Sequence, residues 1–155
     1  MKKVVIYCDG AARNNGKDNN VGGFGAVLRY GDHVKTIKAG FRNVTNNMME
    51  IRAAIEALKQ LKTTNIPVEI NTDSAYLCNC MNQGWYKKWM NNGWVTAGKK
   101  PVENRQLWIE LIELVEQFPF ITFNKVKGHS GIPDNELADR LANEAMDELT
   151  RGAAV

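Results

Sequence analysis

The sequence predicts an α/β fold in which a mixed sheet carries helices on its faces. Two strand patterns meet at Gly31-Asp32, a dipeptide typical of hairpin turns. Helical patterns then separate the remaining strand patterns, so that the later strands follow helix-linked crossovers. A hairpin gives antiparallel pairing and a crossover gives parallel pairing, which together make the sheet mixed. The chain has 155 residues, and we expect residues 1–155 to form a single domain with a sizeable core.

The first part of the chain is dominated by strand patterns. Residues 3–9 alternate and are rich in Val, Ile and Tyr, which predicts a strand. The stretch from 10 to 23 is rich in Gly and Asn and predicts a loop. Residues 23–31 and 33–41 predict the two strands of the hairpin.

A helix pattern follows the hairpin. Thr45, Asn46 and Asn47 offer side chains that cap a helix start. Apolar residues then recur at helical spacing from Ile51 to Leu61, which predicts a helix of about 15 residues.

The second half of the chain alternates helices with two further strands. Residues 67–72 predict a strand, and Ser74 can cap a short helix behind it. Residues 104–117 predict another helix, and residues 120–126 the fifth strand. The last helix begins near Pro133, a residue favoured at the first helical position. Its predicted apolar stripe consists of Leu137, Leu141, Ala145 and Leu149.

Composition is typical of a soluble globular protein, with 44% apolar and 24% charged residues. No apolar run approaches the roughly 20 residues that span a bilayer, so we expect no membrane partner. The start of the chain is basic and then apolar, but the apolar run is too short for a signal peptide and Asp9 interrupts it. We therefore expect a cytoplasmic protein. We also expect a monomer.

The three cysteines, Cys8, Cys78 and Cys80, include no C-x-x-C pair. That odd number argues against a disulfide framework and against a structural zinc site. We expect the three side chains to act as small apolar residues.

Charge is distributed unevenly, although the formal net charge is only +3. No Asp or Glu occurs from residue 74 to 102, a stretch that holds Lys87, Lys88, Lys99 and Lys100. The acids gather in the first half and in the C-terminal third. Such a distribution allows the chain to bind a polyanion in one place and metal ions in another.

Several acids lie where packing alone does not favour them. Asp9 and Asp73 each end a strand pattern, and Glu50 lies in the first turn of the predicted helix. Parallel strands joined by a helix bring their carboxyl ends together, so Asp9 and Asp73 become neighbours if their strands pair. Asp139, beside the apolar stripe of the last helix, is a candidate for a fourth member.

Taken singly, these acids also fit ordinary structural roles. Asp73 and Glu50 fit a helix cap or a helix-dipole partner, and Asp139 alone fits a solvated helix face. Together they fit a metal site, because clustered carboxylates repel one another unless a cation or a proton compensates. Hard oxygen ligands favour Mg²⁺ or Mn²⁺ over zinc.

Motifs along almost the whole chain carry a resemblance to a known family. The motifs are Tyr7-Cys8-Asp9-Gly10, Gly22-Gly23-Phe24-Gly25-Ala26, Thr45-Asn46-Asn47-Met48-Met49-Glu50, Thr72-Asp73-Ser74, Gly93-Trp94, Lys99-Lys100-Pro101-Val102-Glu103-Asn104, Val126-Lys127-Gly128-His129-Ser130-Gly131 and Asn135-Glu136-Leu137-Ala138-Asp139. One of them would be weak evidence, but their order and near-family spacing are specific. The chain resembles the bacterial ribonuclease HI family, of the type 1 ribonuclease H class.

The resemblance implies a ribonuclease H-like fold, with a five-stranded mixed sheet and helices on both faces. It also implies an endoribonuclease that hydrolyses the RNA strand of RNA–DNA hybrids without sequence preference. The implied metal ligands, which are also catalytic residues, are Asp9, Glu50, Asp73 and Asp139. The resemblance gives His129 a catalytic role on a mobile loop, which agrees with the backbone freedom of the flanking Gly128 and Gly131.

The implied chemistry uses two Mg²⁺ ions, for which Mn²⁺ can substitute, roughly 3.5–4 Å apart. In this hypothesis Asp9 bridges both ions, Glu50 and Asp73 hold one, and Asp139 holds the other. The attacking water is activated at one ion and the leaving 3′-oxygen is stabilised at the other, which gives 5′-phosphate and 3′-hydroxyl ends. His129 assists proton movement or product release, so its loss should cost less than the loss of Asp9.

Contacts to the RNA strand are expected near Asp9 and the first helix. Backbone amides around Gly10, with the side chains of Asn46 and Asn47, suit the 2′-hydroxyls that distinguish RNA from DNA. Helix capping is the alternative for the two asparagines, and one of them can do both. Either Asn14 or Asn15 takes the place of the family's RNA-contacting Asn.

Other contacts are expected to phosphates. By resemblance, Thr45 and Asn104 belong to a pocket for a DNA phosphate. Residues 84–100, which we call the basic handle, interleave cations with aromatics and suit a nucleic-acid backbone. The expected contacts in the handle are Lys87, Lys88, Trp89, Lys99 and Lys100. Alternatively, one or two of the handle's three tryptophans fill core space, as we expect for Trp108.

Three other functional classes are compatible with parts of the sequence. A hybrid-binding module without catalysis is disfavoured, because carboxylates without a metal only repel nucleic acid. A DNA nuclease or strand-transfer enzyme of the same fold usually has extra DNA-binding domains, for which we expect 155 residues to leave no room. An actin-like ATPase begins with a related strand-Asp-Gly turn but needs two lobes.

Overall fold

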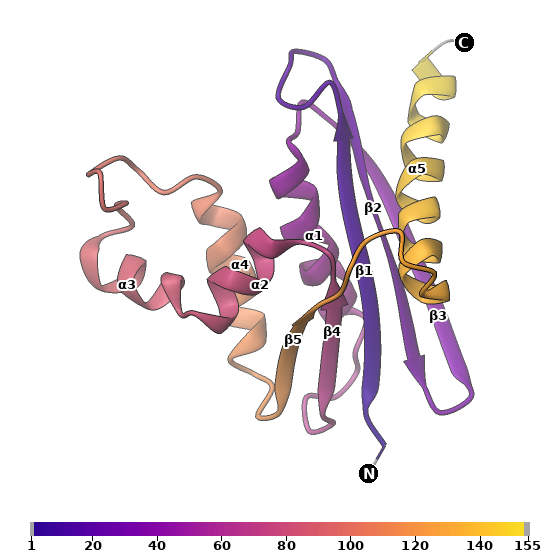
Figure 1. Cartoon of the computed structure of the whole chain (residues 1–155), viewed down its shortest axis with the longest axis horizontal. Helices are drawn as coiled ribbons and strands as arrows, with labels where there is room; N and C mark the ends of the chain where they lie inside the picture. Colours follow the sequence, from indigo (N-terminus) through magenta and orange to yellow (C-terminus); the bar gives the residue numbers. More distant parts are fainter. Residues whose placement is uncertain (1, 154–155) are drawn as a thin grey trace.

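The structure is a computed structural model that describes residues 2–153, and within them five strands and five helices form (Figure 1). The strands are β1 (Val4–Arg13), β2 (Val21–Tyr30), β3 (His33–Arg42), β4 (Val68–Thr72) and β5 (Ile121–Lys125). The helices are α1 (Asn46–Lys59), α2 (Ala75–Asn82), α3 (Trp85–Asn92), α4 (Arg105–Val115) and α5 (Pro133–Ala153). Each strand and helix predicted from the sequence is present, and α3 lies inside the basic handle.

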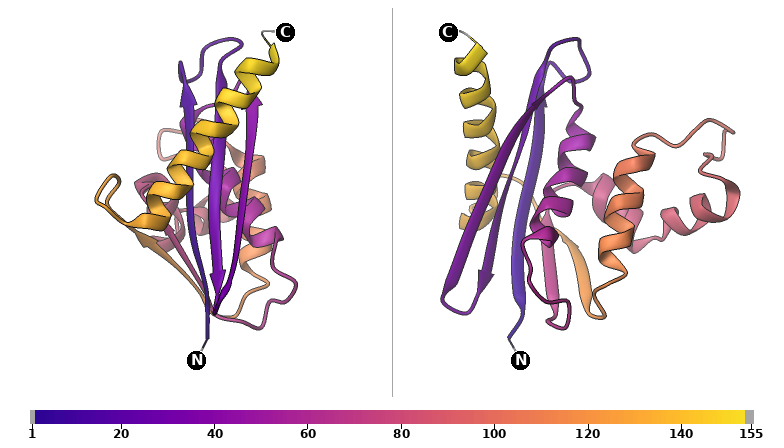
Figure 2. Two further views of the ribbon diagram at one scale, coloured as in Figure 1. Left: turned by 90° about the vertical axis from the view of Figure 1, so that its right-hand side faces the viewer. Right: turned by 180° about the vertical axis from the view of Figure 1, so that it is seen from behind.

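The sheet is mixed, with the strand order β3-β2-β1-β4-β5. The pairs β1–β2 and β2–β3 are antiparallel, whereas β1–β4 and β4–β5 are parallel. Helix α5 covers one face over β1, β2 and β3, and α1 packs on the opposite face with α4 against it (Figure 2). The prediction of a five-stranded mixed sheet with helices on both faces is confirmed.

The predicted loop over residues 10–23 is wrong at both of its ends. Strand β1 continues to Arg13 and β2 begins at Val21, so that only residues 14–20 lie outside the ladder. Gly10 pairs with Phe24 in the antiparallel ladder. Gly, Ala and Asn are poor strand formers on their own, and here pairing with a neighbouring strand overrides that local preference.

Two helix starts are capped as predicted, but by single residues. The side chain of Thr45 accepts a hydrogen bond from the backbone N–H of Met48 at 3.2 Å. Ser74 does the same for the N–H of Leu77 at 3.1 Å, at the start of α2. Because Thr45 is the cap, Asn46 is the first helical residue and its side chain is left for other contacts.

The main core lies between the sheet and the layer of α1, α2 and α4. It includes Ile6, Ile51, Ile70 and Trp108, all of which are fully buried. The indole N–H of Trp108 donates to the hydroxyl of Tyr76 at 3.1 Å, so the one polar atom of this side chain is satisfied. The assignment of Trp108 to the core is confirmed.

All three cysteines lie in the interior of the molecule. Cys8, Cys78 and Cys80 are free and buried, as expected for small apolar residues. No helix between residues 2 and 153 combines the length and the apolar character that a membrane crossing requires.

Helix α5 packs on the sheet through small residues, which corrects the predicted leucine stripe. Ala138, Ala142 and Ala145 are buried, whereas Leu137, Leu141 and Leu149 are half-buried. The alanines face glycines: a Cβ on Gly23 would lie 2.8 Å from the carbonyl oxygen of Ala142, and one on Gly25 would overlap that of Ala138. Because the strands offer glycine at these positions and the helix offers alanine, with Met146 beside them, the helix backbone approaches the strands closely.

This packing predicts that Gly25→Ala destabilises the fold. The new methyl group would collide with backbone atoms of α5, and such overpacking typically costs about 1–3 kcal/mol or more. Gly98→Ala is the matched control, because a Cβ there would meet only the hydroxyl of Thr96 at 3.9 Å. Urea unfolding should show a large loss for Gly25→Ala and a change within about 0.5 kcal/mol for Gly98→Ala. Equal effects would contradict this account of the interface.

Candidate functional site

The sheet topology brings two aspartates together. Strands β1 and β4 are parallel, and the last pair of their register is Tyr7 with Asn71. Asp9 and Asp73 each lie two residues beyond that pair, and α1 adds Glu50. One carboxylate oxygen from each of Asp9, Glu50 and Asp73 lies within 4.8 Å of the other two. The predicted convergence of these three side chains is therefore present.

Two details of the sequence prediction need correction. Asp9 does not end its strand, because β1 continues to Arg13; only β4 ends at this level. Glu50 is the fifth residue of α1 rather than part of its first turn, which contains no acid. Glu50 is 8% exposed. The structural roles of helix cap and dipole partner therefore do not account for Glu50.

Gly10 allows Glu50 to reach Asp9. A Cβ on Gly10 would overlap backbone atoms of Met49 and Glu50, so the absence of a side chain permits α1 to contact β1 at this point. The N–H of Gly10 donates to Asp9 Oδ1 at 3.0 Å, and the same backbone group has a lowering effect on the pKa of Glu50. Gly10 thus contributes both the close approach and a backbone donor.

Thr72 is a member of the site that the sequence did not reveal. Its hydroxyl donates to Glu50 Oε2 at 3.3 Å and accepts from the backbone N–H of Ser74 at 3.2 Å. The residue is fully buried at the end of β4. Its position at the end of a predicted strand, inside the motif Thr72-Asp73-Ser74, is the sequence signal that could have indicated it.

Without a bound cation, only protons can relieve the mutual repulsion of these carboxylates. Burial, followed by the charges of Glu50 and Asp73, raises the pKa of Asp9 well above the usual carboxyl range. Burial and Asp73 likewise raise the pKa of Glu50, against the lowering effect of hydrogen bonds from Gly10 and Thr72. A proton or a cation is therefore needed here, and a cation satisfies several oxygens at once.

Asp139 lies beside this group on α5. It is half-buried, and it is close enough to Asp9 to contribute by hydrogen bonding and by charge to the raised pKa of Asp9. Its neighbour Ala138 packs on Gly25, and Gly25 is the residue paired with Asp9 in the ladder. The close packing of α5 on the sheet therefore brings Asp139 to the edge of the carboxylate group.

The loop that carries His129 is held against Asp73. A Cβ on Gly128 would lie 2.7 Å from Asp73 Oδ2, so the loop backbone approaches the carboxylate directly. His129 is exposed and has a positive φ of 54°, and Gly131 has a φ of 84°. The imidazole is thus carried by a tight turn at the rim of the carboxylate group.

Comparison with known proteins assigns the chain to a family. The RNase H family model matches residues 1–147. The chain belongs to the ribonuclease H family. A ribonuclease H of Clostridium botulinum (strain Hall) is 51% identical over 149 residues, which cover 96% of this chain and 99% of that protein. One of Chlorobaculum parvum is 50% identical over 148 residues, which cover 95% and 97%.

Solved structures of ribonuclease H proteins have the same fold. LC9-RNase H1, a type 1 RNase H with the type 2 active-site motif, matches with a TM-score of 0.82 at 30% identity, over 96% of this chain and 74% of that one. LC11-RNase H1 in complex with RNA/DNA hybrid matches with a TM-score of 0.73 at 27% identity, over 96% and 99%. This ribonuclease H is therefore an enzyme, a nuclease of the hydrolase class.

The asparagines predicted to contact RNA are joined to one another. Asn15 Oδ1 accepts from the backbone N–H of Asn46 at 2.8 Å, and Asn46 Oδ1 accepts from that of Ala12 at 2.6 Å. Asn14 has a positive φ of 53°. Asn15 is thus the asparagine of this turn that lies against α1, and Asn47 follows in the first turn of that helix.

The predicted members of the phosphate pocket lie at two helix starts. Thr45 caps α1. Asn104 precedes α4 with a positive φ of 61°, and its amide donates to the hydroxyl of Tyr76 at 3.3 Å. A pocket for a DNA phosphate at Thr45 and Asn104 stays a prediction.

The basic handle projects from the sheet beyond α2 and α4 (Figure 1). Lys87, Lys88, Lys99 and Lys100 are exposed. Trp94 is buried and Trp89 is half-buried, with their rings 5.9 Å apart. The tryptophans therefore form a packed base under exposed lysines. This agrees with the alternative that one or two of the handle's tryptophans fill core space.

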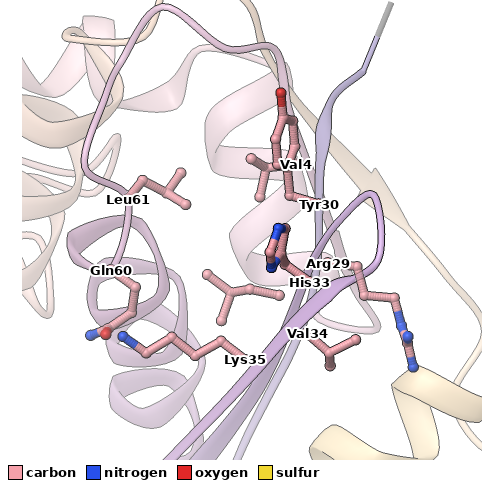
Figure 3. A pocket seen from close by; sticks show the side chains of 9 residues that line it. Val4, Arg29, Tyr30, His33, Val34, Lys35, Gln60 and Leu61 are labelled. Atoms are coloured by element: carbon pink, nitrogen blue, oxygen red, sulfur yellow. The ribbon is translucent and has the colours of Figure 1, made fainter.

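An apolar pocket lies away from the carboxylates, between the β2–β3 hairpin and the end of α1 (Figure 3). Its lining includes Val4, Tyr30, His33 and Leu61 and none of the four predicted metal ligands. His33 is exposed there.

The raised pKa values predict how the stability of metal-free protein depends on pH. A carboxyl whose pKa is raised by folding keeps its proton while the unfolded chain has lost it. Stability therefore falls as pH rises from about 4 through the raised pKa. Asp9→Asn removes one of the repelling charges, so in EDTA at pH 8 it should be more stable than the wild type by more than about 1 kcal/mol.

Denaturant unfolding at pH 4 and pH 8 checks this expectation. The gain should shrink at pH 4, because the carboxyls of the unfolded chain are then also partly protonated and folding takes up fewer protons. Asp32→Asn, at the exposed hairpin turn, is the control and should change stability by less than about 0.5 kcal/mol. A variant Asp9→Asn that is less stable than the wild type at pH 8 would show that repulsion is not the dominant force.

Proposed function

We propose that this enzyme hydrolyses the RNA strand of RNA–DNA hybrids as a magnesium-dependent endonuclease without sequence preference. The observation that carries the proposal is the meeting of three carboxylates within 4.8 Å with Asp139 beside them. A relative of the same fold, LC11-RNase H1, is described in complex with an RNA/DNA hybrid. The alternative of a hybrid-binding module without catalysis gives these buried acids no purpose.

The donor set fits divalent magnesium, with Mn²⁺ as a substitute. The site offers carboxylate oxygens and no thiolate or imidazole within the group of three, which favours hard cations. In the proposal Asp9, Glu50 and Asp73 would hold one ion, and Asp9 and Asp139 would hold the other. When bound, the ions supply charge neutralisation and an acidified water, and cleavage gives 5′-phosphate and 3′-hydroxyl ends.

The chain's own residues orient the scissile phosphate and move protons. Thr72 fixes the direction of the Glu50 carboxylate through its hydrogen bond. In the proposal His129, on its turn against Asp73, assists proton transfer or helps the product leave. Because His129 assists rather than holds the reacting group, its loss should be less severe than that of Asp9.

Recognition of the hybrid depends on sugar and phosphate rather than on base identity. In the proposal Gly10, Asn14 or Asn15, Asn46 and Asn47 contact the RNA strand, where 2′-hydroxyls and an A-like minor groove distinguish RNA. The DNA strand meets Thr45 and Asn104. The exposed lysines of the basic handle, with Trp89, bind the phosphate backbone.

The proposal also covers domain organisation, oligomeric state and compartment. Residues 1–155 act as one domain, because the strands that build the sheet come from both halves of the chain. The protein works as a monomer. Its compartment is the cytoplasm, which agrees with three free, buried cysteines.

A cleavage assay tests the function. With Mg²⁺ the protein should cut the RNA of a labelled hybrid, and it should leave a matched DNA duplex, a matched RNA duplex and a hybrid lacking 2′-hydroxyls at the scissile site uncut. EDTA should abolish the cutting. Asp9→Asn should lower the rate by more than about a thousandfold while still binding the hybrid, whereas Asp32→Asn should cut normally. Turnover by Asp9→Asn would refute the metal-bridging role.

The basic handle predicts a salt effect on binding. Lys87→Ala combined with Lys88→Ala should weaken hybrid binding and reduce the slope of log affinity against log salt by about 2, because two phosphate contacts are lost. The control replaces Lys35 and Lys62, two exposed lysines outside the handle, with Ala. An unchanged slope for the handle variant, or an equal change in the control, would contradict the role of the handle.

A further inference from the structure

A single buried asparagine connects the end of β1 to the segment before α1. Asn20 is 5% exposed. Its amide nitrogen donates to the carbonyl oxygens of Arg13 at 3.0 Å and Val44 at 2.8 Å. Its amide oxygen accepts from the backbone N–H of Val44 at 3.0 Å. One side chain thus satisfies three backbone groups on two segments that are distant in sequence.

Two further hydrogen bonds, one to the side chain of Asn43 and one between backbone groups, repeat the same connection. The N–H of Asn19 donates to Asn43 Oδ1 at 2.6 Å, and the N–H of Asn43 donates to the carbonyl oxygen of Asn20 at 3.2 Å. Asn19 and Asn43 both have a φ of 59°, a left-handed conformation that Asn tolerates better than most residues. The turn of residues 14–20 is therefore bonded along its length to the segment that leads into α1.

The segments joined in this way carry the proposed RNA contacts. Asn15 and Asn46 are exposed and bonded to each other as described above. A backbone N–H can only donate, so both amide oxygens point toward the protein and both amide nitrogens remain free to donate to a ligand. Their relative position depends on how the turn is held against α1.

We propose that Asn20 is a positioning residue for RNA recognition. It fixes the turn of residues 14–20 against the start of α1, so that Asn15 and Asn46 meet the RNA strand as one preformed surface. This inference rests on the proposed function. A turn without Asn20 would have to become ordered at each binding event, which reduces affinity. The carboxylates keep their arrangement, because the side chain of Asn20 bonds to neither Asp9 nor Glu50.

Steady-state kinetics separate this role from a purely structural one. Asn20→Ala should raise the KM for a hybrid by at least about fivefold, which corresponds to the loss of one hydrogen bond between the protein and the RNA. The kcat should stay within about twofold of the wild-type value. The affinity ratio between a hybrid and a DNA duplex of the same sequence, measured in EDTA, should fall by a similar factor. If Asn20 only stabilises the fold, part of the sample is unfolded, so kcat falls and KM does not change.

Asn82→Ala is the matched control. Its amide nitrogen also holds a strand carbonyl, that of Phe123 at 2.9 Å, but it joins α2 to β5. This variant should keep both the wild-type KM and the wild-type affinity ratio.

A double variant tests whether Asn15 and Asn20 act together. Asn15→Ala should lower the affinity ratio in the wild type and add little in the Asn20→Ala background, because the turn is already released. Additive effects, or an unchanged KM for Asn20→Ala, would overturn the inference. Failure of the proposed function looks different: the wild type itself would then neither prefer nor cut the hybrid.

Discussion

Mutual repulsion of buried carboxylates is the constraint that the rest of the structure has to meet. The ion pairs found among residues 2–153 involve none of Asp9, Glu50 and Asp73, so no positive side chain holds them together. The backbone does so instead. Gly10 and Gly128 let α1 and the loop of His129 come into direct contact with strand or carboxylate atoms. The acids are positioned by rigid secondary structure and are ready for cations.

Much of the fold could be predicted because apolar periodicity is a local property. The predictions failed where a neighbour decides the outcome. Residues 10–13 became strand because β2 pairs with them, a long-range effect that overrides the weak strand preference of Gly and Ala. The leucine stripe of α5 was wrong because the opposing strands are lined by glycine. A helix that faces glycines makes its closest contact through alanine.

The acids of the site were visible because an acid after an apolar strand is unusual and because the family motifs surround them. The supporting residues were not visible. Thr72 and Tyr76 act through hydrogen bonds to residues distant in sequence, and sequence spacing carries no information about such pairs. The choice between Asn14 and Asn15 was open for the same reason, since only the fold shows that Asn15 bonds to α1.

The aromatic base of the handle has a spectroscopic consequence. All four tryptophans of the chain, Trp85, Trp89, Trp94 and Trp108, form one cluster in which the ring centroid of Trp89 lies 5.9–6.4 Å from those of the other three. Neither the carboxylate group nor α5 contains a tryptophan. Tryptophan fluorescence therefore reports on the handle and α4. A ligand that reaches the carboxylate group without touching the handle would leave the tryptophan emission almost unchanged.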